Sequence, residues 1–279
     1  MEVLEQGVRT LVVKAKSHAP VMSSSSSIHD TFQHFREELD EHHDRRERLI
    51  KASRDITNIS KKTIFLLHRL ALEANDSSAL INASKIGLDK LVQVQEMYAS
   101  LKNELVGDQF WRYQRQISPG LQEYIEALSF AHFLNDGSLI TYEQVQATLC
   151  GVEGEAYFPL SISDYLLGIS DLTGELMRFA ISGFGSPGGR AKALEICTFV
   201  RGCKADFERF TPYIWELQKK QNVTAQSLAK IEDVAYTAVI RTSEFDLPLE
   251  MLDDIVNQVV SNYHSTRDDD GDRQFGAYS

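Results

Sequence analysis

Two pairs of acidic residues stand at helical spacing inside mostly apolar segments of this sequence. Glu123 and Glu126 are three residues apart in GLQEYIEALSFAHFL, a segment whose apolar residues would surround nearly the whole helix. A helix of that kind is usually buried. Buried paired carboxylates repel each other and are costly to desolvate unless a cation or hydrogen-bond donors compensate. The first pair therefore indicates a place where such compensation is needed.

The second pair, Asp171 and Glu175, is four residues apart in SDYLLGISDLTGELMRF and shares one face of a predicted helix. Asp164 falls near the same line along that helix. Gly168 and Gly174 have no side chain, which permits the close approach of another helix or of a ligand. The glycines would thus allow this helix to pack closely against the helix that carries the first pair.

The four acids converge if the two helices pack side by side. Four carboxylates without a nearby His or Cys suit Mg2+ or Mn2+ better than zinc or iron, and the Glu-x-x-His motifs of di-iron bundles do not occur there. Such an ion binds a phosphodiester, lowers the pKa of a bound water and stabilises charge on oxygen. The spacing alone favours the alternative of solvated surface acids. His132 is interpreted as a packed or capping residue and not as a ligand.

A run of basic residues follows one half of the first predicted helix. These residues are Lys51, Arg54, Lys61, Lys62 and Arg69, with His68 at the edge. Such a face could hold RNA phosphates by charge, without reading bases. The alternative is an ordinary solvated face, which the residues alone favour. Arg45, Arg46 and Arg48 are interpreted as members of surface ion pairs with nearby acids.

The elements that position these residues are all predicted to be helices. Periodicity and turn residues delimit them as Thr31–Leu72, Ser84–Leu105, Phe110–Phe133, Thr141–Leu149, Asp164–Ser182, Arg190–Lys220, Ala225–Arg241 and a short helix over Leu249–Tyr263. Irregularities are expected at Ser118-Pro119-Gly120 and near Thr211-Pro212. We expect an all-α bundle of six or seven helices with a very long first helix, which is typical of a bundle or an oligomer interface.

The composition places limits on the class of protein. Residues 1–27 and the acidic segment 265–279 predict disordered tails around one domain over 28–264. Three cysteines without ligand spacing argue against a disulfide framework or a zinc site. The sequence has neither a long apolar span nor the order of a signal peptide, so we expect a soluble intracellular protein. Our prediction for its location is the cytoplasm and nucleus. With a formal net charge of −11, the chain needs a local patch or a partner to bind nucleic acid.

Several segments resemble the translin-associated factor X group of the translin family. They are SRDIT (53–57), KKTIFLLHR (61–69), GLQEYIEALSF (120–130), DYLLGISDLTGELMR (164–178) and SLAKIEDVAYTAVIR (227–241). The resemblance implies an all-helical fold that assembles with translin into a hollow, octamer-like hetero-oligomer. The acidic EYIE motif argues against translin itself.

The resemblance also implies an activity. It implies a Mg2+-dependent endoribonuclease that cuts single-stranded RNA, including passenger-strand fragments in RNA silencing and fragments from tRNA processing, with single-stranded DNA as a further ligand. It assigns catalysis and metal binding to Glu123, Glu126, Asp171 and Glu175, and it favours RNA binding by the basic face. The alternative is a non-catalytic partner that stabilises translin and regulates its nucleic-acid binding.

Overall fold

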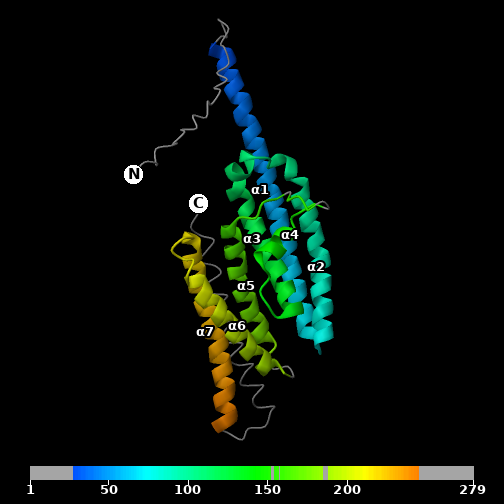
Figure 1. The fold of residues 1–279 in the computed structure, drawn as a ribbon, viewed down its shortest axis with the longest axis vertical. Coiled ribbons are helices and arrows are strands. Elements are labelled where there is room, and N and C mark those ends of the chain that lie inside the picture. The colour runs from blue at the N-terminus through cyan, green and yellow to red at the C-terminus, as the bar shows by residue number, and fades with distance from the viewer. Residues whose placement is uncertain (1–27, 152–153, 157, 185–187, 245–279) are drawn as a thin grey trace, which may run out of the picture. The chain divides into compact units, whose positions relative to one another are not determined.

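The structure, a computed structural model, describes residues 28–151, 154–156, 158–184 and 188–244 (Figure 1). The expected tails and the short helix expected over Leu249–Tyr263 lie outside these residues. Within them the chain forms seven α-helices, one 3-10 turn and no strand, apart from an isolated bridge between Cys150 and Ala156. The all-α prediction is confirmed. None of the described helices has the length and apolarity needed to cross a membrane.

The chain divides into two compact units, residues 1–44 and 45–279. In the first unit, the described residues 28–44 form the start of α1 (Ile28–Glu73) and leave Phe32, Phe35 and Leu39 exposed. The second unit contains the rest of α1, all the other helices and the hydrophobic core. The site residues discussed below all belong to this second unit.

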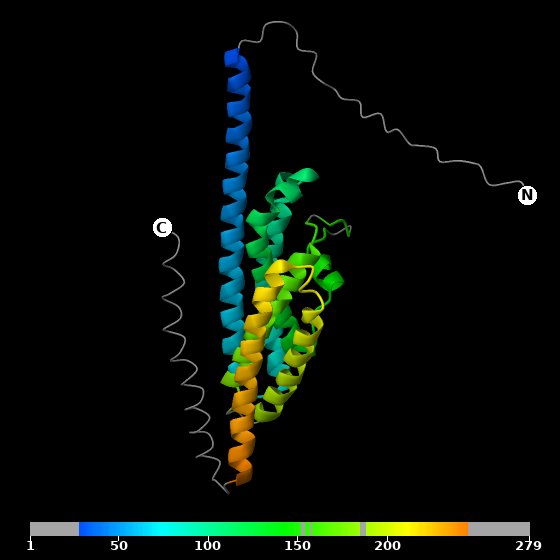
Figure 2. The same cartoon turned by 90° about the vertical axis from the view of Figure 1, so that its left-hand side faces the viewer.

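Two helices are central to the second unit. Its elements after α1 are α2 (Ser77–Ser100), η1 (Lys102–Glu104), α3 (Asp108–Asp136), α4 (Tyr142–Ala147), α5 (Ile162–Ser182), α6 (Gly189–Glu208) and α7 (Trp215–Glu244). Helix α3 packs against α2 and α5, while α5 also packs against α6 and α7, which contact each other (Figures 1 and 2). Both α3 and α5 have apolar residues around most of their circumference, so other helices must cover them on several sides.

A close contact between Ser53 and Gly120 joins α1 to α3. The amide N–H of Gly120 donates to Oγ of Ser53 at 3.0 Å. A Cβ atom on Gly120 would lie 2.8 Å from the backbone oxygen of Ser53, so only glycine fits here without a shift. Helix α3 continues through Pro119, although proline removes one N–H from the helix. The hydrogen bond that Gly120 donates to Ser53 of α1 stabilises the turn of α3 that the proline weakens.

The two glycines of α5 have different surroundings. At Gly168 a Cβ atom would lie 2.7 Å from Cβ of Ile125, so the expected close approach of another helix occurs here. At Gly174 no described atom lies within 4 Å of that position, so no helix packs closely there. The helix begins two residues earlier than predicted because Oγ of Ser161 accepts a hydrogen bond from the N–H of Asp164 at 3.0 Å.

The boundary between α6 and α7 differs from the prediction. The helix predicted over Arg190–Lys220 ends at Glu208, and α7 begins before Lys220. Pro212 explains the break, since proline disfavours helical backbone in the residue before it and has no N–H. Oγ1 of Thr211 donates to the carbonyl of Glu208 at 2.8 Å and thereby satisfies one acceptor at the end of α6. Lys220 consequently lies within α7.

Candidate active site

The predicted acids of α3 and α5 influence one another electrostatically. Burial raises the pKa of Glu126 well above its ordinary value, and the charges of Asp171, Glu175 and Glu123 raise it further. Burial also raises the pKa of Glu123; Lys61 lowers it, and Asp171 and Glu175 raise it. The structure thus brings both predicted pairs into one group, which we call the acidic cluster.

Lysines from two other helices contact the acidic cluster. Nζ of Lys61 in α1 lies 3.7 Å from Oε2 of Glu123, and Lys220 in α7 donates a hydrogen bond to Oδ2 of Asp171. Burial raises the pKa of Asp171, and the charge and hydrogen bond of Lys220 oppose that rise. Both lysines therefore compensate for part of the negative charge that the two acids bring together.

His68 and Arg178 both contact Glu175. Nε2 of His68 lies 2.6 Å from Oε2 of Glu175, and Nη1 of Arg178 donates to the same oxygen at 3.0 Å. His68 is buried, and its ring centroid lies 4.6 Å from that of Phe130. The sequence analysis placed His68 at the edge of an RNA-binding face. In the structure it lies with the acidic cluster, because its position on α1 points toward α3 and α5.

The side chain of Glu126 has no hydrogen bond or ion pair with another residue in the described part of the chain. It is partly buried, and it is the acid on which the other three carboxylates all act. A carboxylate in that position favours a bound cation, because a cation offsets both the desolvation and the repulsion. The donor set of four carboxylates therefore fits Mg2+ or Mn2+ in its chemistry.

The present side-chain positions are not those of a formed metal site. Among the described residues, no three His, Cys, Asp or Glu side chains are arranged to hold a metal ion together. Three of the four acids, Glu123, Asp171 and Glu175, instead contact basic groups, namely those of Lys61, Lys220, His68 and Arg178. Binding of a divalent cation by this cluster would require some of these contacts to open.

A buried polar layer positions α7 so that Lys220 reaches α5. Oγ1 of Thr173 and Oγ1 of Thr224 lie 3.1 Å apart, and Nε2 of Gln221 donates to Oγ of Ser170 at 3.4 Å. Lys220 was not predicted as a site residue, because the predicted helix ends there and the next one begins at Ala225, whereas α7 is continuous from Trp215 to Glu244. One pattern in the sequence could have predicted a continuous helix across this boundary. Five residues that are buried in the structure repeat at helical spacing there, namely Leu217, Gln221, Thr224, Leu228 and Ile231.

Asp164 does not belong to the acidic cluster, although it lies near the same line on α5. It is buried, and its carboxylate accepts hydrogen bonds from Gln114 at 3.3 Å, Ser118 at 3.2 Å, Gln122 at 2.9 Å and Ser161 at 2.6 Å. Three of these donors come from α3. Asp164 therefore ties the start of α5 to α3 and has its hydrogen-bonding capacity filled within the fold.

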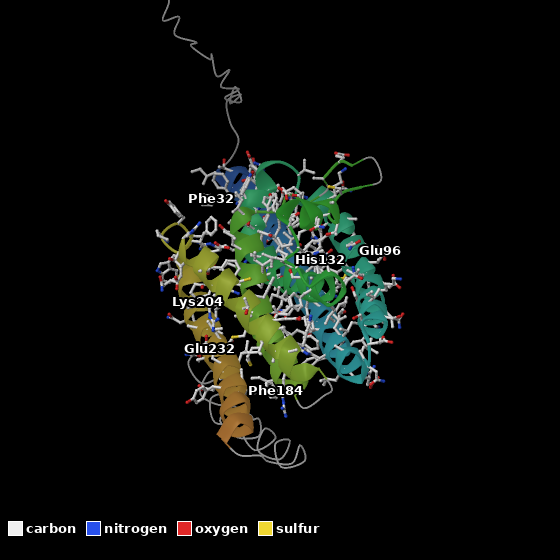
Figure 3. All side chains as sticks on the ribbon, turned by 60° about the horizontal axis from the view of Figure 1, so that its bottom comes forward. Phe32, Glu96, His132, Phe184, Lys204 and Glu232 are labelled. Atoms are coloured by element: carbon white, nitrogen blue, oxygen red, sulfur yellow. The ribbon has the colours of Figure 1, made fainter. Side chains whose placement is uncertain are left out.

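The remaining predicted residues lie on the surface or at a helix end. Lys51, Arg54, Lys61, Lys62 and Arg69 are exposed along α1. His132, labelled in Figure 3, lies at the end of α3, where Nδ1 is 3.2 Å from Oδ2 of Asp136 and Nε2 is 3.3 Å from Oγ of Ser138. His132 thus contacts polar side chains near the end of α3, and its interpretation as a packed or capping residue stays a prediction.

The fold and the site define an all-α bundle protein whose two central helices carry an acidic cluster. The model of the translin family matches residues 44–242, and the chain belongs to this family. Translin-associated protein X from Rattus norvegicus is 38% identical over 255 residues, which cover 84% of this chain and 85% of that protein. Translin from Gallus gallus is 31% identical over 150 residues, covering 53% and 65%. The chain is thus more similar to that translin-associated protein X than to that translin.

A solved structure supports the same fold. The AfC3PO–duplex RNA complex matches with a TM-score of 0.55 and 19% identity, covering 75% of this chain and 97% of the matched chain. At that level of identity the likeness concerns the fold.

Proposed function

We propose that this chain is the catalytic subunit of a Mg2+-dependent endoribonuclease that works in a hetero-oligomer with translin and cuts single-stranded RNA. The acidic cluster is the observation that carries the proposal. Two central helices bring four carboxylates together, and the pKa values of three of them are raised. Such a costly arrangement of like charges is typical of a functional site. Binding of a cation is the simplest function for it, because a cation offsets the repulsion between the carboxylates.

Glu126 and Glu175 would be the principal ligands of the ion, with Glu123 and Asp171 completing the set. Glu126 supports this assignment because its carboxyl has no ion pair or hydrogen bond with a described side chain, and the charge of Lys220 only partly opposes the rise of its pKa. Mg2+, when bound, would lower the pKa of a water ligand and stabilise negative charge on the phosphate oxygens.

The basic residues of the site have a role of their own in this proposal. Lys61 and Lys220 contact Glu123 and Asp171, so both would be released when those acids turn toward a cation. A released lysine next to a bound phosphodiester would bind its non-bridging oxygens. Arg178 remains on Glu175 and keeps that carboxylate oriented. The chain thus supplies both acidic and cationic groups at one place.

Translin as partner and RNA as ligand follow from the family and the charge. The chain belongs to the translin family, and a structure of similar fold is a complex with duplex RNA. The net charge of −11 opposes the binding of RNA by the isolated chain, so the partner would supply part of the positive field. We expect weak RNA binding by the isolated chain and tight, salt-sensitive binding by its complex with translin. Equal affinities in a gel-shift titration would contradict this expectation.

Cleavage by the complex with translin tests the proposal directly. The double variant Glu123→Gln and Glu126→Gln should lose Mg2+-dependent cleavage of a single-stranded RNA and still assemble. The matched control is Glu96→Gln, which changes an exposed acid of α2 and should cleave normally. Undiminished cleavage by the double variant would refute the assignment.

One observation favours a second candidate function. Glu123, Asp171 and Glu175 contact basic side chains, and no three potential ligands in the described residues are arranged for a metal. This arrangement also suits a non-catalytic subunit that stabilises translin and regulates its nucleic-acid binding. That function predicts RNA binding without Mg2+-dependent cleavage, and it predicts that the Gln variants behave like the wild type.

A further inference from the structure

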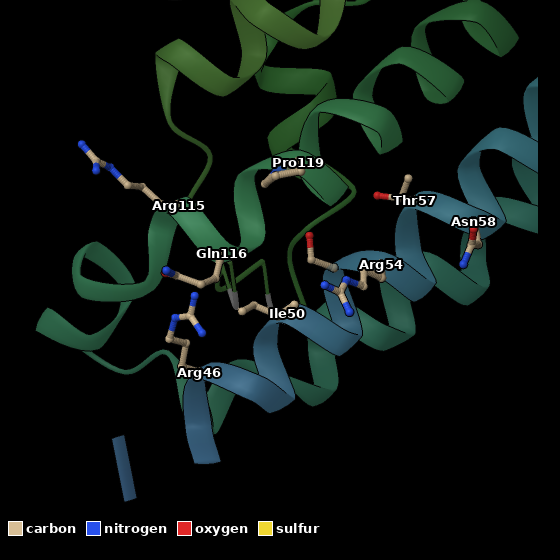
Figure 4. A pocket seen from close by; sticks show the side chains of 9 residues that line it. Arg46, Ile50, Arg54, Thr57, Asn58, Arg115, Gln116 and Pro119 are labelled. Carbon is tan, nitrogen blue, oxygen red and sulfur yellow. The ribbon is translucent and has the colours of Figure 1, made fainter. Parts of the chain in front are cut away.

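A basic groove lies between α1 and α3, next to the acidic cluster. It encloses about 570 Å³ and is lined by Arg46, Ile50, Ser53, Arg54, Thr57, Asn58, Arg115, Gln116 and Pro119 (Figure 4). Three of these side chains are arginines and none is acidic. The sequence analysis assigned Arg54 to an RNA-binding face, assigned Arg46 to ion pairs and did not single out Arg115.

The arginines of the groove are largely free to bind an anion. The side chains of Arg54 and Arg115 form no hydrogen bond or ion pair with other described residues. The guanidinium of Arg46 pairs only with the adjacent Glu47 in that part of the chain, at 2.8 Å. Oε1 of Gln116 is buried without a donor among the described groups. The groove therefore offers several donors and one unsatisfied acceptor. A ribose-phosphate chain, with anionic oxygens and hydroxyl donors, matches this combination better than a bare anion does.

The groove leads to the acidic cluster. Contacts along the seam occur in the same order on both helices, and they join Ser53 to Gly120, Lys61 to Glu123 and His68 to Phe130. The helices therefore run in the same direction here, with the groove at one end and the acids one to two turns further on. From Arg46 to Lys61 the seam is about 22 Å long, at a rise of about 1.5 Å per residue. Several successive phosphates fit along that length.

We propose that this groove binds the sugar-phosphate backbone of single-stranded RNA on one side of the bond to be cut. Arg54, Arg115 and Arg46 would hold phosphates, and the strand would pass along the seam to Lys61 and the acidic cluster. This inference rests on the proposed function for the identity of the ligand. It adds that an RNA long enough to reach the groove has a lower KM than a short one, because the arginines hold the strand and do not touch the reacting atoms.

The test uses the complex with translin carrying Arg54→Gln and Arg115→Gln. The matched control carries Arg112→Gln and Arg209→Gln, two exposed arginines outside the groove. Binding of a fluorescent 20-nucleotide oligouridylate is measured in EDTA, so that no cleavage is needed for the readout. We expect roughly tenfold weaker binding for each lost arginine contact, and a salt slope lower by about 0.7 per contact. The control should match the wild type.

Kinetics and competitors complete the experiment. On the long RNA the groove variant should show a raised KM with a smaller change in kcat. Its KM for a trinucleotide, which is too short to reach the groove, should change less. The double variant Arg54→Lys and Arg115→Lys keeps both charges and should recover much of the binding. Inorganic phosphate at millimolar concentration should not displace the oligouridylate.

The remaining outcomes test either the groove as an RNA-binding site or the proposed nuclease function. Unchanged binding, KM and salt slope in the groove variant would overturn the inference, and so would displacement by inorganic phosphate. Loss of translin from the purified variant would also overturn it, because the groove would then be a protein interface. If the wild-type complex cuts no RNA but binding still depends on Arg54 and Arg115, the groove stands and the proposed nuclease function falls.

Discussion

Nε2 of His68 lies 2.6 Å from Oε2 of Glu175, and this buried contact joins α1 to α5. Replacing His68 with Leu would leave the carboxylate with Arg178 as its remaining described partner. A buried carboxylate that loses a hydrogen bond destabilises the fold, so we expect the free energy of unfolding to fall by about 1–3 kcal/mol. Urea unfolding measures this change.

His43→Leu is the matched control for that substitution, since His43 is exposed on the same helix. It should change the stability by no more than about 0.5 kcal/mol. Equal effects of the two substitutions would mean that the His68–Glu175 contact contributes nothing to stability.

Glu126 should make the stability of the chain depend on pH. Its pKa is raised in the folded state, so the folded chain binds this proton more tightly than the unfolded chain does. The stability associated with the neutral carboxyl is present at low pH and is lost as pH rises from the ordinary glutamate value through the raised pKa. Glu126→Gln cannot ionise. In EDTA the variant should therefore gain stability relative to the wild type as pH rises, by about 1.4 kcal/mol per unit of pKa elevation.

Thermal unfolding at pH 5 and pH 8 checks this expectation. Glu96→Gln, which changes an exposed acid, should show no such difference between the two pH values. A gap between Glu126→Gln and the wild type that is the same at both pH values would count against a buried, ionisable Glu126.

Mg2+ should stabilise the wild-type chain in its complex with translin. A ligand that binds only the folded state adds about 2.7 kcal/mol at one hundred times its dissociation constant. The Glu126→Gln and Glu175→Gln double variant should lose most of the rise in melting temperature. Differential scanning calorimetry with NaCl of equal ionic strength as the reference separates ion binding from screening. An equal rise in both proteins would place any Mg2+ site elsewhere.

Gly168→Ala should destabilise the contact between α3 and α5. The new Cβ atom would lie 2.7 Å from Cβ of Ile125 and 3.0 Å from the backbone oxygen of Gln122, so one helix must shift. Overpacking of this kind typically costs about 1–3 kcal/mol. Gly174→Ala is the internal control because it meets open space, and the better helix propensity of alanine should leave stability unchanged or raise it by up to about 1 kcal/mol. Chemical denaturation of both variants gives the comparison.

Much of the fold was predictable because its signals are local. The apolar period of 100° per residue indicates helices wherever it persists, and each described α-helix overlaps a predicted one. The start of α2 was predicted too late, because Asp76 caps the helix ahead of Ser77. The start of α7 also differs from the prediction. A polar segment around Gln221 and Thr224 suggested a loop, but these side chains are buried against α5. A polar residue on a buried face cannot be told from a loop residue without knowledge of its hydrogen-bond partner.

The sequence by itself determined that two apolar helices carry Glu123, Glu126, Asp171 and Glu175 at spacings that put each pair on one face. Only the tertiary structure decided which side chains meet them. His68 is 107 residues from Glu175, and Lys220 is 49 residues from Asp171. Helical periodicity repeats every few residues, so it shows which face of a helix is apolar. It carries no information about which other helix covers that face, since that choice depends on packing between segments far apart in the chain.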